Sequence, residues 1–360
     1  MNQIYSVIIG TGSYIPERVI KNTDFVNHNF FDESGSKIES PTAEIIEKFT
    51  QITEIKERRH VEPELTTSDM AAFASQKAIE KAGIDAESLD YIILAHNFGD
   101  LKHNSTSSDI LPSLASRVKE ILKINNPKTI AYDIIFGCPG WVQAMIQANY
   151  YIRSGDAKRV LVIGADILSR ISDPHDRDSM IYADGAGATI LEARESDVPV
   201  GILSHSARTD ANGQTYNLFL GKSYNEEHSQ EKVYIKMFGR KIYNYALTHV
   251  PPVVKESLEK ANTKLLDIKK ILIHQANAKM DEAILVRLFK LYGETHIPQG
   301  IMPMTIEKLG NSSVATVPTL LDLILRGELP NQSIGAGDKI VLASVGAGMN
   351  INSVVYQFPA

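Results

Sequence analysis

The chain of 360 residues contains one cysteine, Cys138, and one tryptophan. A single cysteine excludes an intrachain disulfide framework and a cysteine-rich metal site, and we expect no metal. No run of basic residues favours binding to nucleic acid or to a membrane surface. No apolar stretch is long enough to span a membrane, and the N-terminus lacks the basic start of a signal peptide. We therefore expect a cytoplasmic protein that binds neither nucleic acid nor membranes.

The composition is that of an ordinary soluble globular protein. Hydrophobic residues make up 43% of the chain, charged residues 22%, and the net charge is −6. A chain of this length can bury one large core or two smaller ones. Composition therefore limits the class of protein, and local motifs have to supply the chemistry.

Cys138 lies where a strand pattern gives way to a helical pattern. β-branched and aromatic residues cluster in 129–135, whereas apolar residues recur at helical spacing from Val142 to Ile152. Pro139 suits the first helical position, where its missing N–H needs no partner. A thiol at a helix N-terminus is expected to have a lowered pKa and to act as a nucleophile. The alternative is a structural cysteine, because unpaired cysteines are often buried.

Two pairs of segments repeat in the same order along the chain. They are 79–98 with 258–277, and 155–164 with 337–346. The repeats favour a duplicated unit of helices and strands, although chance similarity between common α/β segments is the alternative. We predict an N-terminal half, 1–195, which carries the cysteine and an insertion at 97–128. The C-terminal half is then 196–360.

The two copies differ in residues that can carry chemistry. Ala95 in the first copy aligns with His274 in the second, at the carboxyl end of a predicted strand, where ligands bind in open α/β sheets. Asn311 follows a glycine before another predicted helix, and a turn or capping role is the alternative there. The glycine-rich segments near residues 185 and 346 lack the spacing of a dinucleotide site.

Taken together, the motifs resemble the ketoacyl-ACP synthase III branch of the thiolase superfamily. The resemblance spans nearly the whole chain, in the segments GTGSYIPERVIKN, GCPGW, RSGDAKRVLVIGAD, DPHDRDSMIYADGAGA, HQAN, GNSSVATVP and the terminal GAG. It implies an α/β protein with the thiolase-like five-layered αβαβα fold, built from two duplicated halves, and a homodimer. It also implies a catalytic site of Cys138, His274 and Asn311, with the backbone amides of Cys138 and Ala347 as the oxyanion hole.

The chemistry of that family suits these residue types. A thiolate can accept an acyl group from a thioester, which divides carbon–carbon bond formation into acylation and condensation. Decarboxylation of a malonyl-type or β-ketoacyl extender leaves an enolate, whose oxygen a histidine and an asparagine can stabilise without a metal. The implied substrates are acyl-CoA or acyl-ACP thioesters, the implied partner is acyl carrier protein, and no cofactor is expected.

Departures from the family pattern concern substrate binding. Lys48 and Ile52 stand where the family has an aromatic residue and an arginine that grip coenzyme A. Arg177 is kept, and Lys279 replaces an arginine. Lysine binds phosphate only as a point charge, so we expect the acyl group to come from acyl carrier protein rather than from free coenzyme A.

Two further features are specific to this chain. The family lines its entrance tunnel at the position of Met237, Phe238 and Gly239, although core packing would also explain the two large side chains. The helical part of the insertion is expected to line the pocket or the dimer interface. An ordinary surface helix is the alternative. In these features the chain resembles condensing enzymes of specialised metabolism, including those that make alkylresorcinol or cyclohexanedione precursors.

Two other functions stay open on the same scaffold. One is an acyltransferase that moves the acyl group to a hydroxyl or amine acceptor. The other is a non-enzymatic subunit that supports a catalytic partner.

Overall fold

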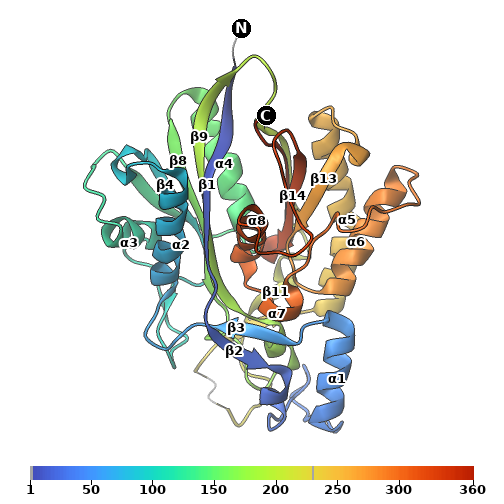
Figure 1. Cartoon of the computed structure of the whole chain (residues 1–360). Coiled ribbons are helices and arrows are strands. Elements are labelled where there is room, and N and C mark those ends of the chain that lie inside the picture. Colours follow the sequence, from blue (N-terminus) through green and yellow to red (C-terminus); the bar gives the residue numbers. More distant parts are fainter. Residues whose placement is uncertain (1–2, 229–230) are drawn as a thin grey trace.

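The computed structural model describes residues 3–228 and 231–360. Two large sheets dominate this part of the chain (Figure 1). The first has the order β1 (Gln3–Tyr14), β9 (Asp184–Ser196), β8 (Arg159–Ile167), β4 (Tyr91–Ala95) and β7 (Ile130–Ile134). The second has the order β10 (Gly201–Thr209), β15 (Asn350–Gln357), β14 (Lys339–Gly346) and β13 (Ile268–Ile273).

Helices form three layers around the two sheets (Figure 1). The outer layers are α2 (Thr67–Ala82) with α3 (Leu114–Ile121) on the first sheet, and α5 (Gly239–Lys260) with α6 (Ala278–Leu291) on the second. The central layer is α4 (Gly140–Ser154) with α8 (Thr316–Leu325). A separate apolar cluster fills each space between a helix layer and a sheet or between the sheets, as layered packing requires. The predicted αβαβα fold is confirmed.

The two sheets repeat one topology, which confirms the duplication. In the first, β4 is parallel to β8, β8 is antiparallel to β9, and β9 is antiparallel to β1. In the second, β13, β14, β15 and β10 have the same relations. Within the described residues β7 has no counterpart strand in the second sheet. The boundary at residue 195 falls inside the end of β9 and stays a prediction.

Small elements cover the end of the sheets where β7, β13 and β14 finish (Figure 1). They are α1 (Thr42–Thr53), α7 (Ile306–Leu309), β2 (Arg18–Lys21), β3 (Glu57–His60), β11 (Leu218–Gly221) and β12 (Tyr234–Met237). A fourth apolar cluster, which includes Phe49, Ile181 and Ile235, holds this cover to the body of the protein. The cover therefore encloses the carboxyl ends of the central strands.

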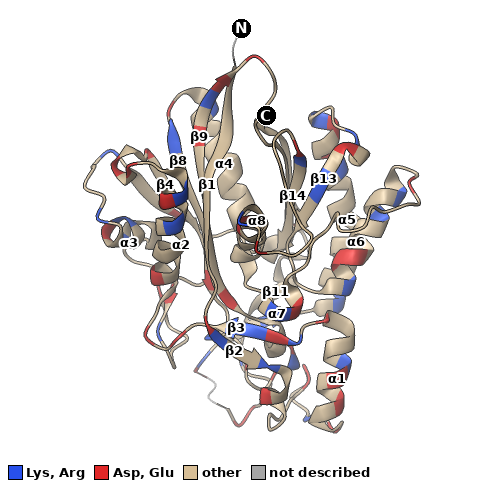
Figure 2. Ribbon diagram, viewed as in Figure 1, with Lys and Arg blue, Asp and Glu red and all other residues tan. Residues whose placement is uncertain are grey.

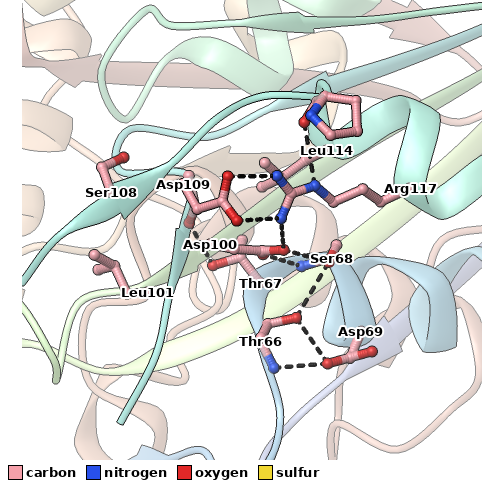
Figure 3. A network of polar contacts seen from close by, with 12 residues as sticks. Thr66, Thr67, Ser68, Asp69, Asp100, Leu101, Ser108, Asp109, Leu114 and Arg117 are labelled. Atoms are coloured by element: carbon pink, nitrogen blue, oxygen red, sulfur yellow. Dashed lines mark hydrogen bonds and ion pairs between the residues drawn. The ribbon is translucent and has the colours of Figure 1, made fainter. Parts of the chain in front are cut away.

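The insertion at 97–128 contains β5 (Asp100–Leu101), β6 (Ser108–Asp109) and α3. Figure 3 shows Arg117 of α3 donating to Asp100 at 2.8 Å and to Asp109 at 2.7 Å, while Asp100 accepts from Ser68 of α2. α3 packs on α2 and β7, and none of its residues lines the cavity described below. The prediction that this helix lines the pocket is therefore wrong. Its place in a dimer interface stays a prediction.

Candidate active site

A cavity of about 960 Å³ opens between the cover and the carboxyl ends of the strands. Cys138, His274 and Asn311 all line it. Cys138 comes from the N-terminal half, directly before α4, and the other two come from the C-terminal half. The fold thus brings the three residues of the predicted site into one cavity, although they are far apart in the sequence.

The backbone around Cys138 packs tightly against the turn after β14. Gly137 has φ +71°, and a Cβ there would lie 2.7 Å from the Ala347 nitrogen. A Cβ on Gly346 would lie 2.6 Å from the Cys138 nitrogen. Both positions therefore need glycine for close backbone approach. This packing sets the amides of Cys138 and Ala347 in adjacent segments, which suits the predicted oxyanion hole.

Cys138 is half-buried in the cavity wall, and its surroundings disfavour the thiolate. Burial raises the pKa of Cys138 to about 11, and the charge of Asp166 adds to the rise. The Ser313 hydroxyl, which donates to Sγ at 3.5 Å, acts in the opposite direction. The lowered pKa expected from the end of α4 is therefore not found, because desolvation of the thiolate is the largest effect. Acyl transfer then needs a base to take the thiol proton.

His274 follows β13 directly and is buried. Burial lowers its pKa to about 4, so the ring is neutral at pH 7. Nδ1 lies 2.7 Å from the Thr316 hydroxyl, which is also 3.0 Å from the Ser313 carbonyl oxygen. If the hydroxyl donates to the carbonyl, Nδ1 carries the proton and Nε2 is a base. If the hydroxyl turns to donate to Nδ1, Nε2–H becomes a donor.

Asn311 fixes a turn and also lines the cavity, so the turn role and the predicted site role are compatible. Its Oδ1 accepts from the Ser313 amide at 2.8 Å, which fixes the turn. Its backbone is held on both sides, since it donates to the Ile181 carbonyl and accepts from the Ala183 amide. With the side-chain oxygen occupied, the Nδ2 group is the end left to donate to a substrate.

A buried polar group beside Cys138, made of Asp166, Asn97 and Ser313, is not among the residues predicted from the sequence. Asp166, at the end of β8, accepts from the Asn97 amide at 2.8 Å and from Asn97 Nδ2 at 2.7 Å. Asn97 Nδ2 also donates to Ser313 Oγ at 3.0 Å, and Ser313 donates to the thiol. Burial raises the pKa of Asp166 to about 6. Polar residues at the carboxyl ends of two adjacent strands are the signal that could have found this group.

The predicted substrate-binding residues divide into two sets. Arg177, Met237 and Gly239 line the cavity, whereas Phe238 and Lys279 do not. The Phe238 ring packs 5.6 Å from the Phe219 ring, and Lys279 is exposed on α6. Lys48 and Ile52, the residues that replace the coenzyme A grip, are also in the cavity wall, together with Arg240, which the sequence did not indicate.

No group of three or more His, Cys, Asp or Glu side chains in 3–228 and 231–360 is placed to hold a metal ion. In the same residues no helix combines the length and the apolar character needed to cross a membrane.

Comparisons with known proteins agree on one family. The family model for 3-oxoacyl-[acyl-carrier-protein (ACP)] synthase III matches residues 132–211, and the model for its C-terminal part matches 258–358. The β-ketoacyl-[acyl-carrier-protein] synthase III of Pectobacterium atrosepticum is 31% identical over 99% of this chain and 100% of its own.

Solved structures give the same result. The 3-oxoacyl-[acyl-carrier-protein] synthase III of Aquifex aeolicus has a TM-score of 0.78 and 31% identity, with 98% of this chain and 100% of its own chain covered. The priming β-ketosynthase of the R1128 polyketide pathway has a TM-score of 0.80 and 26% identity, with 99% and 97% covered. The chain therefore belongs to the 3-oxoacyl-[acyl-carrier-protein] synthase III family and is an acyl-transferring condensing enzyme of that type.

Proposed function

We propose that Cys138 takes an acyl group from a thioester and that the same cavity then condenses it with a decarboxylating, malonyl-type extender on acyl carrier protein. The observation that carries this proposal is the meeting of Cys138, His274 and Asn311 in one cavity, beside the closely packed Cys138 and Ala347 segments. A nucleophile, a base and amide donors are the groups that the two steps need.

In the first step Sγ of Cys138 attacks the carbonyl carbon of the donor thioester. The high pKa of the thiol makes a base necessary. Nε2 of His274 accepts the thiol proton, since burial keeps this ring neutral at pH 7. The amides of Cys138 and Ala347 stabilise the tetrahedral oxyanion. The carbon–sulfur bond of the donor then breaks, and the departing thiolate takes the proton from His274.

In the second step the extender loses its carboxylate as carbon dioxide. The electron pair of the broken bond forms an enolate, and Asn311 Nδ2 donates to its oxygen. Between the steps His274 loses the Nδ1 proton to water and gains one from water at Nε2, while the Thr316 hydroxyl turns to donate to Nδ1. Nε2–H then also donates to the enolate oxygen. The enolate carbon attacks the acyl carbonyl on Cys138 and the bond to Sγ breaks. The released thiolate takes up a proton, which restores the starting enzyme.

We further propose that acyl carrier protein is preferred over free coenzyme A as the donor. Lys48, Arg177 and Arg240 are exposed basic residues in the cavity wall. Figure 2 shows further basic residues on β2 at the same end of the molecule, where Arg18 and Lys21 are exposed. Such a local patch complements an acidic carrier despite the net charge of −6.

The test is intact-mass measurement of Cys138 loading from acyl-ACP and acyl-CoA of the same chain length. Wild type should gain the acyl mass and Cys138→Ala should not, because no other nucleophile is proposed. Loading from acyl-ACP should be faster and should lose its advantage in high salt, which screens the basic patch. Acylation of Cys138→Ala at the wild-type rate would refute the nucleophile, and equal loading from both donors at every salt concentration would refute the carrier preference.

A further inference from the structure

Tyr182 carries a buried hydroxyl group in the wall of the active-site cavity. The residue is only 4% exposed, and within the described chain its hydroxyl has no hydrogen-bond partner. Buried polar groups are nearly always paired in folded proteins, since an unpaired group loses its bonds to water without replacement. A group of this kind on a residue that lines a substrate cavity points to a partner that arrives with the substrate.

The backbone fixes Tyr182 beside Asn311. The two residues are partners in a parallel β-bridge, with the Asn311 amide donating to Ile181 and the Ala183 amide donating to Asn311. Directly paired residues present their side chains on the same face. Both residues line the cavity, so the two side chains start from paired backbone positions in the wall beside the position proposed for the enolate.

The hydroxyl can act only as a neutral donor. Burial raises the pKa of Tyr182 well above its usual value, and the charges of Asp178, Asp176 and Cys138 add to this effect. The proton therefore stays on the oxygen throughout the physiological pH range. An acceptor that gains negative charge during the reaction is the partner that such a donor stabilises most.

We propose that the Tyr182 hydroxyl donates a hydrogen bond to the thioester oxygen of the malonyl-type extender, next to Asn311 Nδ2. The inference rests on the proposed condensation and adds a donor from this chain to the enolate step. The thioester oxygen is chosen over the carboxylate of the extender for a chemical reason. A donor to the carboxylate would stabilise the group that has to leave and would slow decarboxylation, whereas the thioester oxygen gains charge in the transition state.

Tyr182→Phe tests this with little change in cavity shape, because the ring is kept. Acyl loading of Cys138 should be unchanged, while kcat and kcat/KM for condensation with malonyl-ACP should fall together by about 10- to 100-fold. The melting temperature should stay the same or rise, since the variant removes an unpaired buried hydroxyl. A merely structural role would lower it instead.

Tyr292 supplies the matched control. Its hydroxyl is also buried without a partner in the described chain, but Tyr292 follows α6 and does not line the cavity. Tyr292→Phe should leave loading and condensation unchanged.

Three results for Tyr182→Phe would overturn the inference: unchanged condensation, faster decarboxylation, or an equal loss of loading and condensation. Absence of acyl loading on wild-type Cys138 would instead refute the proposed function, so the two failures can be told apart.

Discussion

The Thr316 hydroxyl can donate its proton either to Nδ1 of His274 or to the Ser313 carbonyl oxygen. Because this choice sets the tautomer of the ring, Thr316 is a positioning residue for His274. Thr316→Val keeps the shape of the side chain but leaves Nδ1 without the contact at 2.7 Å. We expect rates of both loading and condensation to fall by about tenfold, the rate equivalent of one neutral hydrogen bond. Single-turnover rates of the two steps measure this.

Thr319→Val, one turn along α8, is the control. It removes a buried hydroxyl from the same helix at a position outside the cavity and should leave both rates unchanged. If Thr316→Val also kept wild-type rates, the hydroxyl would have no part in setting the tautomer of His274.

At the level of single residues, the sequence predicts the site through its ordered motifs. Cys138, His274 and Asn311 each follow or precede a recognisable strand or helix, and the resemblance supplies their combination. The neighbours that set the protonation of these residues could not be predicted in the same way. Asp166 and Ser313 are far apart in the sequence, and only the packing of the folded chain brings them together. A motif does not show how deeply a side chain is buried. The predicted shift of the Cys138 pKa is therefore downward, whereas burial raises it.

Among the elements, α3 shows how an insertion can be fixed by charge. Arg117 joins Asp100 and Asp109 across β5 and β6 (Figure 3). Arg117 is 18% exposed and Asp100 6%, so Arg117→Ala leaves a nearly buried carboxylate without its cation. We expect the free energy of unfolding, measured by urea denaturation, to fall by about 1–3 kcal/mol.

Arg208→Ala provides the comparison, since Arg208 pairs with Asp210 at the surface. An exposed pair contributes about 0–1 kcal/mol. Equal losses in the two variants would show that the network of Figure 3 adds nothing beyond an ordinary surface ion pair.

Regular elements of the two halves could be predicted, and the cover over the cavity could not. The predicted strand at 129–135 is β7 at Ile130–Ile134, and the helical pattern after Cys138 is α4. Both have strong periodicity and lie next to each other in sequence. β2 with β3 and β11 with β12 are short pairs, whose pairing depends on contacts with the body of the protein.

For the whole molecule, the duplicated halves create one site from residues that neither half holds alone. In the described chain the outer strand β7 leaves an open edge; Ile130 on the strand is 49% exposed and Ile135, just after it, is 65% exposed. An apolar open edge suits pairing with a second copy and supports the homodimer, which stays a prediction for sedimentation to test.

We propose that loading on Cys138 is followed by decarboxylative condensation in the same cavity. The most direct measurement follows carbon dioxide and product in a single turnover of acyl-loaded enzyme with carboxyl-labelled malonyl-ACP, for wild type and Asn311→Ala. Wild type should release carbon dioxide equimolar with the β-ketoacyl product. Asn311→Ala should load normally but condense about 100-fold more slowly, because a donor to the enolate is lost. Transfer of the acyl group to a hydroxyl or amine without carbon dioxide release, or equal loss of both steps in Asn311→Ala, would contradict the account.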